Sequence, residues 1–149
     1  MTKMLITNAK KEGIPGSVHI LIDGEKIADI TSEKPDIPAQ EIDAGGKLVL
    51  PGLINIHMHL DKCGLAETIP SETGTLAEAR KKILEAKPGF KRSDIKARAR
   101  KTVLQALQEG VTAIRSHVDV DPTIGLRGVE ALLELKEELL QISHRELLE

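Results

Sequence analysis

Two histidines separated by one residue, His57 and His59, are the strongest chemical feature of the sequence. They end a mostly apolar segment, residues 48–60, which predicts a strand buried on both faces, as in a parallel sheet. Residues i and i+2 of a strand point to the same side, so the two imidazoles should project together. Neutral imidazoles are common ligands of divalent metals. We therefore predict that His57 and His59 bind a metal ion, the alternative being two unrelated histidines near a strand end.

A second group of polar residues, Arg115, His117 and Asp119, alternates with other residues in the segment 111–120. This segment predicts a strand that places all three side chains on one face. Three polar groups are costly to bury without partners. We expect them to ring a polar site beside the two histidines, the alternative being the solvated face of an exposed sheet.

The residues that follow the histidine pair form a possible support for the site. Asp61 and Lys62 are expected to orient the metal ligands or to line the mouth of the site, with an ordinary solvated loop as the alternative. Cys63 is expected to be a small buried thiol rather than a ligand. The loop 65–74 is expected at the catalytic face of a barrel.

The first third of the chain predicts short strands. Residues 18–22 and 26–30 alternate on either side of Asp23-Gly24, which predicts a β-hairpin. Residues 32–46 hold two prolines and are expected to be loop or edge structure. His19 is expected at the surface.

The rest of the chain alternates strands with helices, which indicates an α/β fold with a parallel sheet. Helices are predicted over 75–87, 93–109 and 126–140, and Thr75 and Glu78 of the first match a capping box. Only two strands are predicted among these helices, whereas a complete TIM-type barrel takes ~250 residues. We therefore expect the first two βα units of an incomplete (β/α)8 barrel.

Composition excludes several classes of protein. The 149 residues carry 21 Lys and Arg against 23 Asp and Glu, a net charge of -2 that argues against a nucleic-acid partner. No apolar run approaches the ~20 residues of a membrane-spanning helix, so no membrane partner is expected. The single cysteine excludes an internal disulfide and predicts a reducing, cytoplasmic location. The basic run 91–101 lacks interleaved aromatic residues and predicts the solvated face of a helix.

Two segments carry a resemblance to a known family. Residues 50–62, LPGLINIHMHLDK, resemble the first-strand motif of the amidohydrolase superfamily, and residues 115–120, RSHVDV, resemble the second-strand motif of its cytosine deaminase branch. The hairpins near the N-terminus are similar to the small β-sandwich that precedes the barrel in that family. The resemblance implies a β-sandwich portion over residues 1–50 and a partial metal-dependent hydrolase barrel over residues 51–149.

The resemblance also implies roles for individual residues. His57 and His59 would be the first two ligands of a catalytic zinc or iron. His117, Asp119, Arg115 and Asp61 would contact the substrate or lie just behind the metal ligands. The remaining ligands and the general acid/base are expected beyond residue 149, so the chain is expected to be the N-terminal portion of a truncated or interrupted enzyme and to be inactive alone.

The expected reaction is hydrolysis of a C–N bond, most simply deamination of cytosine or a related aminated heterocycle by metal-bound hydroxide. The sequence does not distinguish among cytosine, another aminated heterocycle and an N-substituted triazine. One alternative is a non-catalytic module that self-associates or binds a partner through uncovered barrel surface. Another is a small metal-binding protein that uses His57, His59 and His117.

Overall fold

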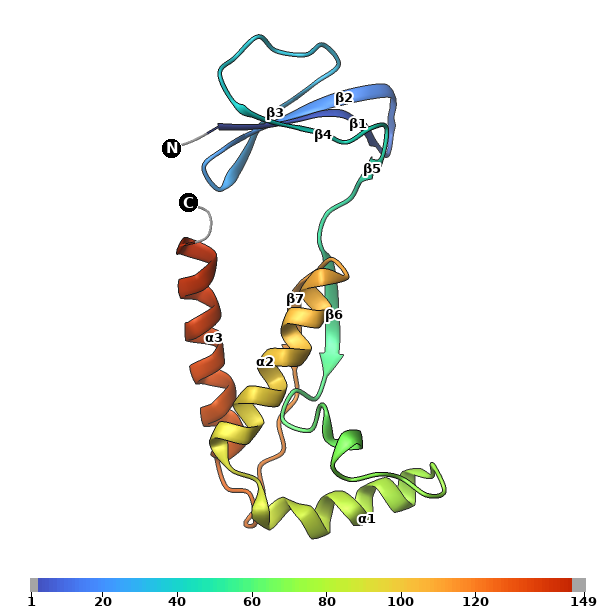
Figure 1. Cartoon of the computed structure of the whole chain (residues 1–149), viewed down its shortest axis with the longest axis vertical. Coiled ribbons are helices and arrows are strands. Elements are labelled where there is room, and N and C mark those ends of the chain that lie inside the picture. The colour runs from blue at the N-terminus through green and yellow to red at the C-terminus, as the bar shows by residue number, and fades with distance from the viewer. Residues whose placement is uncertain (1–2, 146–149) are drawn as a thin grey trace. The chain divides into compact units, whose positions relative to one another are not determined.

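The computed structural model describes the backbone of residues 3–145 and the side chains of residues 3–140. It shows a mixed α/β protein that divides into two compact units, Met1–Pro51 and Gly52–Glu149 (Figure 1). Among the described residues, none of the helices has the length and apolar character needed to cross a membrane.

The first unit is a five-stranded sheet in the order β3-β2-β1-β4, with β5 also paired to β1. The predicted hairpin is confirmed: β2 and β3 pair antiparallel around Asp23-Gly24, and Gly24 has the positive φ of 60° that the turn requires. The strands are β1 (Lys3–Lys11), β2 (Ile14–Asp23), β3 (Lys26–Thr31), β4 (Gln40–Asp43) and β5 (Leu48–Val49).

The core of the first unit is aliphatic. Ala9, Val18 and Ile20 form a buried cluster with partly buried aliphatic side chains packed around it, and Leu5 is fully buried as well. His19 lies between Val18 and Ile20 and is itself only 8% exposed, so its expected surface position is wrong. Three consecutive buried residues mean that both faces of β2 are covered at this point.

The second unit contains a parallel pair of strands, β6 (Leu53–Met58) and β7 (Val111–Ser116), which confirms the predicted parallel pairing. The three predicted helices are also confirmed. They are α1 (Leu76–Ala86), α2 (Arg92–Gln108) and α3 (Arg127–Arg145), and two short 3-10 helices, η1 (Leu65–Glu67) and η2 (Lys87–Gly89), precede and follow α1.

The single strand predicted over residues 48–60 is wrong in its extent. Pro51 and Gly52 divide it, so β5 belongs to the sheet of the first unit and β6 to that of the second. Proline has no N–H for a ladder hydrogen bond, which explains the break. Gly52 must be glycine for a second reason: a Cβ there would lie 2.0 Å from Oγ1 of Thr112.

One face of the β6–β7 pair is covered by helices. Met58 of β6 and Ile114 of β7 pack against a core formed by Leu60, Ala99 of α2 and Leu135 of α3. Basic side chains of α2, including Arg92, Lys96 and Arg100, form ion pairs with carboxylates of α3.

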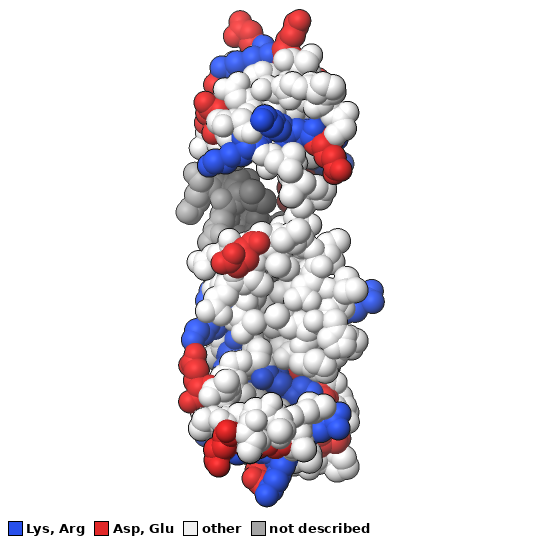
Figure 2. Space-filling view, turned by 90° about the vertical axis from the view of Figure 1, so that its right-hand side faces the viewer, with Lys and Arg blue, Asp and Glu red and all other residues white. Residues whose placement is uncertain are grey.

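Burial of β6 on both faces, as its apolar sequence predicts, is not observed. Leu53, Ile54 and Ile56 are 54%, 68% and 69% exposed. Figure 2 shows a broad, mostly uncharged area over the second unit, on the side where β6 lies in Figure 1. The reason is that no further strand or helix of the described residues lies against these side chains.

Candidate functional site

Three histidines meet where β6 and β7 end. His57 is in β6, His59 follows that strand by one residue, and His117 follows β7 directly. The ring centroids of His57 and His59 are 5.3 Å apart, and the ring of His117 lies 4.4 Å from that of His57 and 5.6 Å from that of His59. The carboxyl ends of parallel strands meet at one edge of a sheet, where ligand sites of α/β proteins are found.

Hydrogen bonds donated by backbone N–H groups hold the two strand ends together. The N–H of His117 donates to the carbonyl of Met58 at 2.7 Å, and the N–H of Leu60 donates to Oγ of Ser116 at 3.1 Å. Within β6, the side chain of Asn55 accepts the N–H of His57 at 3.1 Å. These hydrogen bonds therefore fix the backbone at or beside each of the three histidines.

The histidines have the donor chemistry of a metal site. Nδ1 of His59 is buried and has no hydrogen-bond partner within the described part of the chain, although buried polar atoms are usually paired. The described part of the chain, however, contains no group of three or more His, Cys, Asp or Glu side chains arranged to hold a metal ion. The imidazoles thus fit part of a divalent-metal site, and a complete ligand set needs further donors.

Asp61 joins the segment after β6 to the segment after β7. Its side chain is buried, and its Oδ2 accepts the backbone N–H of Asp119 at 3.0 Å. The other carboxylate oxygen, Oδ1, is buried without a partner among the described residues. The guanidinium of Arg98 donates to the carbonyls of Asp61 and Cys63, which fixes the backbone here.

Asp119 lies between two ammonium groups. Its Oδ1 accepts Nζ of Lys62 at 2.8 Å, and its Oδ2 accepts Nζ of Lys87 at 3.0 Å. Lys87 also donates to Oδ2 of Asp121 at 2.6 Å. Hydrogen bonds from Lys62 and Lys87 lower the pKa of Asp119, and the bond from Lys87 lowers the pKa of Asp121 to about 2. The same carboxylates, Asp121 first, raise the pKa of Lys87.

The predicted strand over residues 111–120 ends early, at Ser116. Of the three polar residues expected on one face of it, only Arg115 is in the strand. The side chain of Arg115 is exposed and has no hydrogen bond or ion pair with the residues that the structure describes. His117 reaches the other histidines, whereas Asp119 faces the two lysines. The strand pattern fails here because side-chain bonds replace the ladder beyond His117.

Lys87 and Asp121 are absent from the sequence prediction. The Lys-Pro-Gly segment predicts a helix end, and Asp-Pro predicts a turn, so neither motif points to an ion pair across 34 residues. Asp121 does act in the turn, because its Oδ1 accepts the N–H groups of Thr123 and Ile124. Lys87 is only 5% exposed, and this burial, which indicates a structural role, can be seen only in the folded structure.

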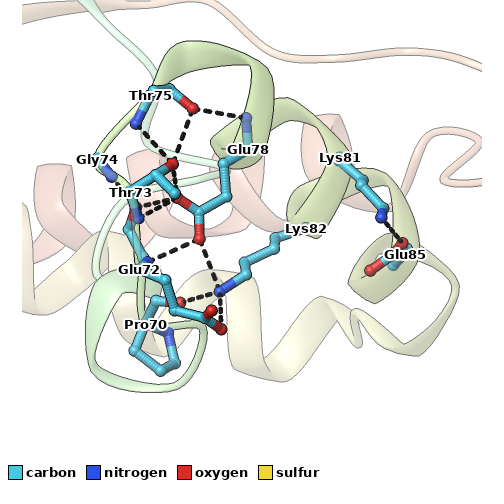
Figure 3. A network of polar contacts seen from close by, with 10 residues as sticks. Pro70, Glu72, Thr73, Gly74, Thr75, Glu78, Lys81, Lys82 and Glu85 are labelled. Carbon is cyan, nitrogen blue, oxygen red and sulfur yellow. Dashed lines mark hydrogen bonds and ion pairs between the residues drawn. The ribbon is translucent and has the colours of Figure 1, made fainter.

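The loop between β6 and α1 is held by Glu78 (Figure 3). Thr75 caps α1 by accepting the N–H of Glu78, which confirms that side of the predicted capping box. The carboxylate of Glu78 reaches further back than a capping box predicts, to the N–H groups of Glu72 and Thr73 at 2.7 Å. Lys82, one turn along α1, bonds to Glu78 and to the carbonyl of Pro70. The loop is thus tied to the first turns of the helix.

Comparison with known proteins identifies the relatives of this chain. The model of the Amidohydrolase family matches residues 40–144. N-isopropylammelide isopropyl amidohydrolase of Pseudomonas sp. (strain ADP) is 32% identical over 141 residues, which cover 91% of this chain and 35% of that protein. Several dihydroorotases match a shorter region, including one from Bacillus caldolyticus that is 44% identical over 72 residues, 47% of this chain and 17% of that protein.

Solved structures give the same picture. N-isopropylammelide isopropylaminohydrolase of Burkholderia multivorans is 30% identical with a TM-score of 0.77, over 93% of this chain and 35% of that one. The 5-methylcytosine deaminase of Klebsiella pneumoniae, liganded with 5-fluorocytosine, is 32% identical with a TM-score of 0.79, over 91% of this chain and 33% of that one. The chain therefore spans about a third of the length of these relatives.

Proposed function

The chain belongs to the amidohydrolase family, and from that premise we propose that it supplies the first part of a metal-dependent site for hydrolysis of a C–N bond. The substrate we propose is cytosine or another aminated heterocycle, in line with the substrates named for the relatives. The meeting of three imidazoles at the ends of β6 and β7 is the observation that carries the proposal.

The proposed roles follow the surroundings of each residue. His57 and His59 would hold zinc or iron, supported by Nδ1 of His59, which is buried without a partner from residues 3–140. A divalent ion bound there would lower the pKa of a water molecule to about 7 and so make hydroxide available at neutral pH. His117, within ring contact of His57, would face the substrate from the neighbouring strand.

A catalytic zinc usually has three protein ligands and an open position. Two histidines leave this set incomplete. We therefore propose that the 149-residue chain binds a divalent ion weakly and does not turn over substrate by itself. The general acid/base would come from further residues of a longer amidohydrolase, and the location we propose is the cytoplasm.

Zinc titration of the chain by isothermal calorimetry tests the metal proposal. We expect binding with about one ion per chain and loss of that binding when both His57 and His59 are changed to Gln. The matched control is Glu25→Gln in the exposed β2–β3 turn, which should leave binding unchanged. Wild-type protein that binds no zinc, or a double variant that binds as well as wild type, would contradict the proposal.

The exposed apolar side chains of β6 favour a second candidate, a non-catalytic module that associates with a second copy of itself. Leu53, Ile54 and Ile56 are each more than half exposed and lie within residues 53–56 of one strand. Exposed apolar residues that lie close together are typical of interaction surfaces. Zinc binding distinguishes the two candidates, because association through β6 requires no metal.

A further inference from the structure

The segment that follows β7 needs support other than a β-ladder. Its last ladder-like bond is the one from the N–H of His117 to the carbonyl of Met58. Buried or half-buried backbone groups still require partners, so the position of residues 118–121 has to come from side chains. Asp61 accepts a backbone N–H of this segment, and Lys62 and Lys87 bond to the side chain of Asp119 within it.

Asp61 fixes this segment from the β6 side. Its carboxylate accepts the N–H of Asp119, and it lies in a tightly packed place next to α3. A Cβ added at Gly128 would lie 3.5 Å from Cβ of Asp61 and 2.9 Å from Cγ1 of Val118. The residues after both strands therefore lie against the start of α3, with little room to shift.

Lys87 fixes the same segment from the α1 side. Its side chain is only 6% exposed, and its ammonium contacts Asp119 and Asp121, two carboxylates of one short segment. A buried charge is tolerated when it is paired and hydrogen-bonded. Lys62 occupies the remaining oxygen of Asp119. Both oxygens of Asp119 are thus engaged by lysines rather than turned to the histidines.

We infer that Asp61 and Lys87 are positioning residues that hold residues 117–121 against the end of β6 and so keep His117 beside His57. Asp119 belongs to the same device and has no direct part in binding substrate. The inference rests on the proposed function, because holding His117 beside His57 matters only if the histidines form part of a site. The contact between the two rings can nevertheless be measured without metal or substrate.

Nuclear Overhauser effects between the ring protons of His57 and His117 test the inference in the 149-residue chain. The wild-type protein should show them, because the ring centroids are 4.4 Å apart. We expect Lys87→Met and Asp61→Ala to lose these effects while α2 and α3 keep their amide spectra. Lys101→Met is the matched control, because Lys101 forms an exposed ion pair with Glu67 and should leave them intact.

A conservative variant distinguishes a role of Asp61 in positioning His117 from a general contribution to the stability of the fold. Asp61→Asn keeps an oxygen that accepts the N–H of Asp119, so it should retain the ring contact that Asp61→Ala loses. If folded Lys87→Met and Asp61→Ala keep the nuclear Overhauser effects between the rings of His57 and His117, the inference is overturned. Unfolding of both variants would also overturn it, since it would assign the cluster to the stability of the whole unit.

Zinc affinity gives an independent readout. Substituting residues that orient metal ligands typically costs 10–100-fold in affinity. We therefore expect about a tenfold loss in Asp61→Ala, because Asp61 holds the segment that directly follows the proposed ligand His59. If the wild-type chain binds no zinc, the proposed function fails while the ring contact still decides the inference. If zinc binds but the ring contact survives both substitutions, only the inference fails.

Discussion

Two glycines, Gly52 and Gly128, lie where the backbone passes very close to the side chains of other segments, and they show how single residues shape the site. At Gly52 the backbone passes the side chain of Thr112, and at Gly128 it passes Asp61 and Val118. Neither position requires a positive φ, so the reason for glycine is space rather than backbone conformation. The sequence does not reveal the contacts of Gly52 with Thr112 and of Gly128 with Asp61, because each joins residues 60 or more positions apart.

Gly52→Ala should lower the free energy of unfolding by about 1–3 kcal/mol, the usual cost of forcing an extra carbon into a packed place. Thermal or urea unfolding of the variant measures the loss. Gly89→Ala is the control, since a Cβ there has no atom within 4 Å. Equal stability of Gly52→Ala and wild type would mean that β7 moves aside without cost.

At the scale of elements, the β6–α1 loop depends on one carboxylate. Glu78 receives bonds from Thr73, Glu72 and Lys82, and the bond from the Thr73 hydroxyl contributes most to holding the pKa of Glu78 well below its usual 4.5. A carboxyl group with a lowered pKa in the folded state stabilises the protein above its ordinary pKa. That contribution is lost as the pH falls through the folded-state pKa.

Glu78→Gln should therefore destabilise the chain most at neutral pH, and the difference from wild type should shrink as the pH falls below 4. Unfolding followed at several pH values between 3 and 7 measures this. Glu85→Gln, which removes an exposed ion pair with Lys81 in the same helix, should show little pH-dependent difference. A constant difference across the range would contradict the role of the charge.

Helices and strands could be predicted from the sequence where the signal lies within a few neighbouring residues, as apolar spacing, helix caps and turn dipeptides do. The three helices and the hairpin fall where apolar spacing, Thr75 and Asp23-Gly24 predict them. The end of β7 was not predicted, because side-chain bonds to residues far along the chain replace the ladder beyond His117. The break at Pro51 was missed because the apolar run continues on both sides of it. The histidine pair was predictable from its spacing of two, whereas the lysine between two aspartates required the tertiary structure.

At the scale of the whole molecule, the apolar face of β6 dominates the expected behaviour in solution. Ile54 and Ile56 are more than two-thirds exposed in the described structure. Such a surface favours association, because removing apolar area from water is worth about 25 cal/mol per Å².

The double variant Ile54→Lys, Ile56→Lys should shift the chain towards monomer, and light scattering after size-exclusion chromatography measures the change. Leu84→Lys is the control, since Leu84 is 63% exposed on α1 and away from the strand. A wild-type chain that is already a stable monomer would contradict self-association and leave the amidohydrolase proposal unaffected.

The sharing of one ammonium by Asp119 and Asp121 constrains how this sequence can change during evolution. Loss of Lys87 alone would leave two neighbouring carboxylates repelling each other, and loss of either aspartate would remove half of the lysine's neutralising partners. Related genes should therefore exchange these three codons together, and a correlated pattern at positions 87, 119 and 121 should be visible when enough family members are aligned.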